Sequence, residues 1–239
     1  MKQQQRVVVS PRERQQPRIV RVKNQFLFSR DSKSACVPIS ILALYHLYEQ
    51  RERVMRDAEW TEVMHRGAAH WRIWKERSGS LRNMPTVREV LALDACRDFV
   101  ALFGSEPREC AGLVRDLEGV DNPEGSFEAA LRQMTTVVCQ EGRQVCALVI
   151  LPRAICISLL CLREANNPGG YRFLLFDSHG SPESEWCDYG EFSDCEAVLG
   201  RLVEKRRLVE CKVSQEEMRL CDEETLQAAY GYSLMLFIQ

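Results

Sequence analysis

Residues 36–48 read CVPISILALYHLY, a run that is apolar at all but two of its positions. A helix of this composition is buried on nearly all sides. Two serines shortly before the run are good capping residues and Pro38 suits a first helical turn, so we expect the helix to begin close to Cys36. A helix N-terminus favours negative charge and lowers the pKa of a nearby thiol. Cys36 is therefore the best candidate for a reactive thiol among the eleven cysteines.

The rest of the first half of the chain is also predicted to be helical. Tryptophans and small apolar residues recur at helical spacing in a second segment, and a Thr86–Glu89 capping box opens a third. The expected helices run from Trp60 to about Ser78-Gly79, from Pro85 to about Phe99, and from Ser126 to Gln140. Together with the helix at Cys36 they would form a helical lobe.

Short apolar and β-branched runs predict strands in the second half of the chain. A turn signal, Asn-Asn-Pro-Gly-Gly, separates two of these runs, so antiparallel pairing is expected. The predicted strands cover 145–151, 155–162, 171–177 and 233–238, and two further helices cover about 194–207 and 214–229. The fold class is therefore α+β, with an N-terminal helical lobe packed on a mainly antiparallel β-sheet.

The size and composition of the chain fit one globular domain. It has 239 residues, of which 45% are hydrophobic and 28% charged, enough for one substantial core. Arg153 interrupts the longest apolar stretch, and the N-terminal MKQQQR does not have the pattern of a signal peptide. We therefore expect no membrane segment and a location in the reducing cytoplasm or nucleus.

The cysteines indicate free thiols and no metal. Their number is odd, no CxxC or CxxH occurs, and the four histidines are scattered, whereas structural zinc usually needs close ligand pairs. Several cysteines lie in apolar runs such as VCALVIL, where a reduced thiol packs as a small hydrophobic side chain. We expect neither a metal nor another cofactor.

Charge divides the chain at residue 23. Residues 1–23 hold seven basic residues and one acidic residue, for +6, which leaves −8 for residues 24–239 because the whole chain carries −2. The first segment is predicted to be a flexible basic leader, although Arg18–Val22 could pair as an edge strand. Nucleic-acid contact by the leader is disfavoured because no aromatic residue interleaves its charges. Residues 24–239 are expected to form the one folded domain.

A histidine that could act as a base stands at the end of a predicted strand. Residues 171–180 read YRFLLFDSHG, and strand alternation puts Asp177 and His179 on one face, where their side chains can bond. The alternative is a plain turn in which Asp177 bonds backbone amides. His46 lies ten residues after Cys36 on the same predicted helix. That places it about 15 Å away along the axis, too far to serve as a partner.

A cysteine in one lobe and a histidine in the other are the parts of a thiol protease. Such an enzyme needs a nucleophilic thiolate, an imidazole to move the proton, a group to orient that imidazole, and donors for the oxyanion. In order and spacing, three segments resemble the papain-like deubiquitinases at the N-terminus of herpesvirus large tegument proteins. These segments are FLFSRDSKSACVPIS at 26–40, EWTEVMHRGAAHWRIW at 59–74 and YRFLLFDSHG at 171–180.

This resemblance implies a papain-like cysteine protease fold over residues 24–239 and a role for each matching residue. Cys36 would be the nucleophile, His179 the general base, and Asp177 the group that orients the imidazole. In the family a glutamine upstream of the cysteine supplies the oxyanion donor, and Gln25 stands eleven residues before Cys36.

The sequence leaves alternatives open for the supporting residues. Asn24 has the same donor chemistry as Gln25, and either amide could instead cap a loop. The imidazole could be oriented by Asn166, Asn167 or Asp188. The chain also departs from the family pattern, because Phe26-Leu27-Phe28 replaces a Gly-rich linker.

The reaction that the resemblance implies is hydrolysis after the C-terminal Gly-Gly of ubiquitin or a ubiquitin-like protein, which would be the partner of this chain. Two other functions are compatible with the same residues. The first is a cysteine hydrolase or acyltransferase of the same fold that acts on another amide or thioester. The second is a catalytically silent interaction module, in which Cys36 fills the core and Asp177-Ser178-His179-Gly180 is only a turn.

Overall fold

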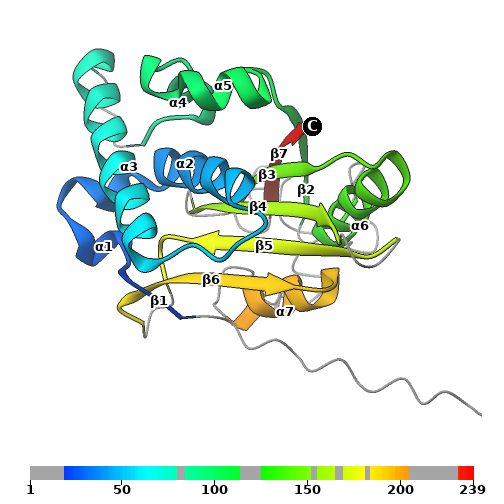
Figure 1. Ribbon diagram of the computed structural model, residues 1–239. Coiled ribbons are helices and arrows are strands. Elements are labelled where there is room, and N and C mark those ends of the chain that lie inside the picture. The colour runs from blue at the N-terminus through cyan, green and yellow to red at the C-terminus, as the bar shows by residue number, and fades with distance from the viewer. Residues whose placement is uncertain are drawn as a thin grey trace, which may run out of the picture.

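One antiparallel sheet forms the centre of the molecule. The computed structural model describes residues 19–79, 84–113, 125–151, 155–164, 169–180, 184–204 and 231–239. Within them, seven strands pair in the order β1-β6-β5-β4-β3-β7-β2 (Figure 1). Their bounds are β1 Ile19–Lys23, β2 Arg108–Leu113, β3 Val145–Leu151, β4 Ile155–Arg163, β5 Tyr171–Asp177, β6 Trp186–Phe192 and β7 Gly231–Ile238.

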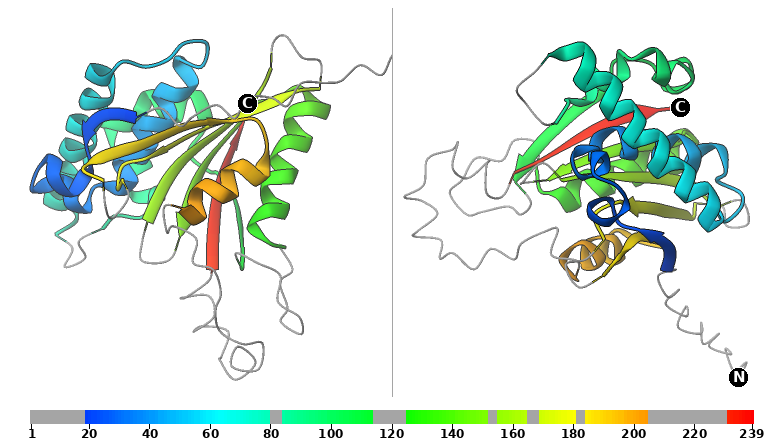
Figure 2. Two further views of the ribbon diagram at one scale, coloured as in Figure 1. Left: turned by 90° about the horizontal axis from the view of Figure 1, so that it is seen from below. Right: turned by 90° about the vertical axis from the view of Figure 1, so that its left-hand side faces the viewer.

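Helices cover both faces of this sheet (Figure 2). The first face carries α2 Cys36–Glu49, α3 Asp57–Ser78, α4 Val87–Leu91, the short turn η2 Asp94–Cys96 and α5 Arg97–Phe103. The second face carries α6 Phe127–Thr136, which continues into the π turn η3 Val137–Glu141, and α7 Cys195–Glu204. Two short elements, α1 Gln25–Phe28 and η1 Asp31–Ser34, lead from β1 to the start of α2.

The packing of α2 against its neighbours explains its composition. Every residue from 36 to 44 is buried, because α2 lies between the sheet and α3. The two helices approach closely at Gly67, where an added Cβ would lie 2.4 Å from Cγ1 of Ile39. Trp60 of α3 stacks on Phe176 of β5, with ring centroids 4.2 Å apart. Large aromatic contacts of this kind fix α3 against the strand that ends in Asp177.

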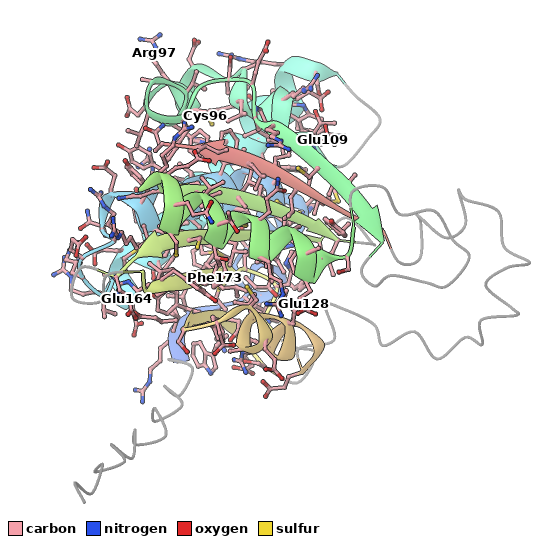
Figure 3. All side chains as sticks on the ribbon, turned by 90° about the vertical axis from the view of Figure 1, so that its right-hand side faces the viewer. Cys96, Arg97, Glu109, Glu128, Glu164 and Phe173 are labelled. Carbon is pink, nitrogen blue, oxygen red and sulfur yellow. The ribbon has the colours of Figure 1, made fainter. Side chains whose placement is uncertain are left out.

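The second face has a core of its own, seen from outside in Figure 3 with Glu128 of α6 labelled. Phe173 and Leu175 of β5 point into it, whereas Leu174 and Phe176 belong to the first core. This is the alternation that the sequence of β5 predicts. The exposed side of α6 is polar, with Arg132 paired to Glu128.

Most of the predicted elements are confirmed. The predicted helices at Cys36 and at Trp60 are α2 and α3, and the latter ends at Gly79, which takes a left-handed conformation. The predicted strands are β3, β4, β5 and β7. The α+β class with an antiparallel sheet is confirmed as well. The predicted helix over 214–229 lies outside the described residues.

Two expectations about the helices are wrong. The single helix expected from Pro85 to Phe99 is broken into α4, η2 and α5, because Leu93 has an extended backbone between them, although the Thr86–Glu89 capping box is present. The helices and the sheet are not fully segregated either. The helix predicted from Ser126, which is α6, packs with α7 on the face opposite α2, so helices cover both sides.

The boundary placed after residue 23 must also be corrected. Residues 19–23 form β1, which pairs with β6 at one edge of the sheet. Val20 and Val22 are buried in the first core, while Arg21 faces solvent. Apolar and basic side chains alternate along this strand, so its net positive charge is compatible with one buried face. The strand belongs to the folded domain. Among the described residues, none of the helices combines the length and the apolar character that crossing a membrane requires.

Candidate active site

Cys36 is the first residue of α2, as the sequence predicts, and its side chain is fully buried. Burial raises the pKa of the thiol to about 12, and the negative charge of Asp177 adds to the rise. Backbone hydrogen bonds from Cys156, Val37 and Cys36 itself act in the opposite direction. The helix N-terminus thus lowers the pKa as expected, but desolvation outweighs it. The thiol is protonated at neutral pH in this arrangement.

A pair of buried serines fixes α2 on the sheet beside this thiol. Ser40 Oγ donates to the carbonyl of Cys156 at 2.8 Å, and Ser158 Oγ donates to the carbonyl of Ser40 at 2.7 Å. Buried hydrogen bonds of this kind hold one register between two elements, because leaving either group unpaired is costly. They keep the start of α2 next to the backbone of β4.

Asp177 and His179 are in direct contact at the end of β5. Ring Nδ1 of His179 lies 2.7 Å from Oδ1 of Asp177, and the backbone N–H of His179 donates to the same oxygen at 2.9 Å. Both side chains are buried. The sequence offers a turn closed by Asp177 and a bond from Asp177 to the imidazole as alternatives, and the structure has both. With Nδ1–H donating to the carboxylate, Nε2 is the ring nitrogen that can accept a proton.

Gly180 lets the chain turn directly after His179. It has a φ of 64°, and an added Cβ would lie 2.3 Å from the carbonyl oxygen of Trp186 on β6. A side chain cannot fit in that space, so the glycine permits the close approach of the turn to β6. The position of His179 is thus fixed by the residues on either side of it in the chain, Asp177 before it and Gly180 after it.

Gln25 lies against the same turn, although it stands in α1. Its backbone N–H donates to the carbonyl of Ser178 at 2.8 Å, and its Oε1 accepts from Ser178 Oγ at 2.7 Å. Its Nε2 donates to the carbonyl of Lys33 at 3.2 Å, and its own carbonyl accepts from Ser32 Oγ at 2.5 Å. The candidate oxyanion donor is therefore bonded both to the segment that leads into Cys36 and to the turn that carries His179.

Asn24 has a structural role. Its Oδ1 accepts from the backbone N–H groups of Phe26 and Leu27, so it caps α1. Its Nδ2 donates to the carbonyl of Ser184 at 2.8 Å. Both ends of this amide are used to place α1.

Of the other groups considered for orienting the imidazole, Asp188 has a different partner. Asp188 of β6 forms a partly buried bidentate pair with Arg201 of α7. A guanidinium fork of this kind occupies both carboxylate oxygens. Asn166 and Asn167 lie outside the described residues.

A second pair of cysteine and histidine lies away from this site. Nδ1 of His70 lies 3.7 Å from Sγ of Cys96, which is labelled in Figure 3 beside α5. Burial lowers the pKa of His70 to about 4 and raises that of Cys96 to about 11, so both groups are neutral and form a structural contact. His65 is exposed on α3, and His46 is at the far end of α2 from Cys36.

The cysteines and acidic residues offer no cluster for a metal within the described ranges, where nine cysteines are free thiols. Two features of the site have no clear signal in the sequence. The first is the bond from Ser178 to Gln25, since a serine between Asp177 and His179 reads as an ordinary turn residue. The second is Phe26, whose half-exposed ring lies 5.8 Å from the His179 ring between centroids.

A comparison with solved structures supports the fold. A scan against models of protein families and a search of curated proteins found no match. Among solved structures, the chain is similar to the ubiquitin-specific protease encoded by murine cytomegalovirus tegument protein M48, crystallised in complex with a ubiquitin-based suicide substrate. The match has a TM-score of 0.61 and 13% identity, and it covers 93% of this chain and 86% of that one. The Pseudomonas avirulence protein AvrPphB also matches, with a TM-score of 0.40, 12% identity, and coverage of 92% and 97%.

At this identity the similarity concerns the fold. The resemblance of the sequence to the herpesvirus tegument proteases is confirmed at that level. The chain has the papain-like cysteine protease fold that its cysteine, tryptophan-rich and histidine segments predict.

Proposed function

We propose that this protein is a cysteine protease that hydrolyses the bond after the C-terminal Gly-Gly of ubiquitin or a ubiquitin-like protein. The observation that carries the proposal is the 2.7 Å contact between Asp177 and His179 in this fold. The negative charge of Asp177 contributes to the raised pKa of the Cys36 thiol. The end of β5 therefore lies close enough to the start of α2 for the two groups to interact. Cys36, His179 and Asp177 are the proposed catalytic residues, and Gln25 is the proposed oxyanion donor.

The first half of the proposed reaction forms a thioester. Because the buried thiol is protonated, Nε2 of His179 takes its proton as Sγ of Cys36 attacks the carbonyl carbon of the terminal glycine. Asp177 keeps Nδ1–H on the other side of the ring and stabilises the imidazolium. An N–H of Gln25 stabilises the oxygen that becomes negative. The imidazolium then gives its proton to the leaving amine as the C–N bond breaks.

The second half of the reaction regenerates the enzyme. His179 takes a proton from water, and the resulting hydroxide attacks the thioester carbon. The C–S bond breaks, and the proton returns from His179 to Sγ of Cys36. The products are the free carboxylate of the modifier and the amine released in the first half.

Two observations support ubiquitin or a relative as the substrate. The structural neighbour was crystallised with a ubiquitin-based suicide substrate. The chain carries −8 after residue 23, and the tail that precedes Gly-Gly in ubiquitin is basic, so long-range attraction would favour their encounter. Such a substrate would place the enzyme in the cytoplasm or nucleus, in keeping with its free thiols.

The test is incubation of the protein with ubiquitin that carries a C-terminal electrophile, followed by intact mass measurement and mapping of the modified residue. We expect one adduct, on Cys36. Parallel reactions with electrophiles built on ubiquitin-like proteins would identify the preferred modifier. No adduct with any of them, together with no turnover of Gly-Gly-amide substrates, would contradict the proposal.

The matched control for this experiment is Cys96, whose Sγ lies 3.7 Å from Nδ1 of His70. Cys36→Ala should abolish the adduct and leave the fold intact, whereas Cys96→Ala should leave the adduct unchanged. An adduct that persists in Cys36→Ala would refute the assignment of the nucleophile. Retention of more than about a tenth of the turnover would do the same, because losing a covalent nucleophile normally costs several powers of ten.

A further inference from the structure

The orientation of the Gln25 side chain is set by its two polar neighbours. The carbonyl oxygen of Lys33 can only accept a hydrogen bond, so the NH₂ end of the carboxamide faces it, at 3.2 Å. Oε1 then faces Ser178 Oγ at 2.7 Å, and the serine hydroxyl must donate. Ser178 is fully buried, which leaves water little access to replace this bond.

This orientation leaves a defined donor for the substrate. A carboxamide has two N–H groups, and Lys33 takes one, so the other is the group that would meet an oxyanion. Rotation of the amide by half a turn would bring Oε1 against the carbonyl oxygen of Lys33. Two acceptors would then face each other, and Oε1 would lose its donor. The carbonyl of Lys33 therefore selects this orientation, and the hydroxyl of Ser178 holds the carboxamide in it by donating to Oε1.

Ser178 also ties the donor to the base. Its carbonyl accepts from the backbone N–H of Gln25 at 2.8 Å, so the two residues are bonded twice. Ser178 stands between Asp177 and His179, and the turn that they form places it. A shift of that turn would move the imidazole and the oxyanion donor together.

We propose that Ser178 is a positioning residue, which holds the carboxamide of Gln25 in place and couples it to the turn of Asp177 and His179. This inference rests on the proposed function, because it assumes that Gln25 stabilises an oxyanion. Its kinetic signature follows from that assumption. Losing the hydroxyl of Ser178 lowers kcat through Gln25 alone and leaves KM unchanged.

The kinetic test is a double-mutant cycle on turnover of ubiquitin with a fluorogenic C-terminal amide. Gln25→Ala should lower kcat about 10²–10³-fold, as removal of one oxyanion donor does. Ser178→Ala should lower kcat about tenfold, and the double variant should be no slower than Gln25→Ala. Two results would overturn the inference and leave the proposed function standing. The first is a double variant in which the two losses of kcat add up. The second is a Ser178→Ala variant with wild-type kcat when Gln25→Ala is slow.

The matched control is Tyr232→Phe, which also removes a buried hydroxyl, but one that donates to the carbonyl of Gly125 in the core on the opposite face of the sheet. It should lower the thermal stability about as much as Ser178→Ala does and leave kcat close to the wild-type value. If Tyr232→Phe lowers kcat as strongly as Ser178→Ala, the effect of Ser178 is a general one on stability, and the inference is refuted.

A second measurement does not depend on activity. Side-chain NH₂ signals of ¹⁵N-glutamine-labelled protein can be recorded by NMR, with Gln25 assigned from the signal pair lost in Gln25→Ala. We expect Ser178→Ala to move this pair and to speed its exchange with water, while Tyr232→Phe leaves it in place. An unchanged pair in Ser178→Ala refutes the inference even in an active enzyme. A shifted pair in a protein without turnover supports the positioning role and refutes the proposed function.

Discussion

Oδ1 of Asp177 binds His179 twice, through ring Nδ1 at 2.7 Å and through the backbone N–H at 2.9 Å. The backbone N–H can only donate, so an oxygen atom must occupy this position. The same atom therefore closes the turn and fixes the tautomer of the imidazole. Because one oxygen atom accepts both bonds, the orientation of an asparagine side chain at position 177 can be predicted.

Asp177→Asn should keep both bonds, because the backbone N–H selects the amide oxygen and turns the NH₂ away from the ring. The variant then loses only the negative charge that stabilises the imidazolium. We expect kcat to fall about 10–10²-fold, less than the roughly 10⁴-fold loss of an amide that enforces the wrong tautomer. Asp177→Ala should be slower than Asp177→Asn, since it removes the acceptor as well.

Steady-state kinetics on a ubiquitin amide substrate would measure this difference, with KM expected to change little. Asp188→Asn is the control, because Asp188 binds Arg201 and should affect the stability rather than kcat. A loss near 10⁴-fold in Asp177→Asn would mean that the NH₂ faces the imidazole after all. If kcat is unchanged in both Asp177→Asn and Asp177→Ala, another residue orients the imidazole.

The pH dependence of Cys36 alkylation follows from its raised pKa. Burial and the charge of Asp177 raise this pKa to about 12, so the thiolate is a minor species at neutral pH and its fraction grows as the pH rises. Since the thiolate is the reactive form, we expect the rate with a small neutral alkylating reagent to rise about tenfold per pH unit from pH 7 to pH 9. Mass mapping of the alkylated peptide isolates Cys36 from the other thiols. A plateau reached below pH 8 would instead reveal a thiolate already formed as an ion pair with His179.

The sequence carries enough local information to predict the elements around the site. Helical burial at Cys36 and strand alternation up to Asp177 are local patterns, and both are confirmed in α2 and β5. The break near Leu93 is different, because its extended backbone conflicts with the helical pattern on either side. Tertiary packing overrides local propensity at such a place.

Contacts between distant segments explain what the sequence could not predict about the site. The bond between Ser178 and Gln25 joins residues 153 positions apart, so no local pattern records it. The pKa of Cys36 likewise depends on burial by the whole fold. The position of Cys36 at a helix N-terminus does not predict that burial. The candidate residues themselves follow from motifs, whereas their orientation follows from the tertiary structure.

The edge strand β1 should be necessary for the stability of the domain. Val22 is buried in the core between the sheet and α3, so Val22→Asp places an unpaired carboxylate among apolar side chains. We expect the free energy of unfolding to fall by roughly 3 kcal/mol or more. Arg21→Gln, on the exposed face of the same strand, should change it by no more than about 0.5 kcal/mol. Urea unfolding followed by tryptophan fluorescence measures both, and equal stability of the two variants would mean that the strand is dispensable.

The aromatic ring of Phe26 should assist His179 through packing. Its centroid lies 5.8 Å from that of the imidazole, with the rings tilted by 54°, while 48% of Phe26 is exposed. A tilted pair of this kind restricts the motion of both rings. In Phe26→Ala the imidazole loses this neighbouring ring, so we expect kcat to fall about tenfold, a loss typical of a reacting group held less well.

The neighbour Leu27 is the matched control, since it is 56% exposed on the same short helix. Leu27→Ala removes a similar apolar area and should leave kcat near the wild-type value, and Phe26→Tyr should retain it because the ring stays. Rates of capture by the ubiquitin electrophile, measured beside kcat, would follow the same order. Equal losses in Phe26→Ala and Leu27→Ala, mainly in KM, would show that both residues act by contacting the substrate and that the ring does not hold the imidazole.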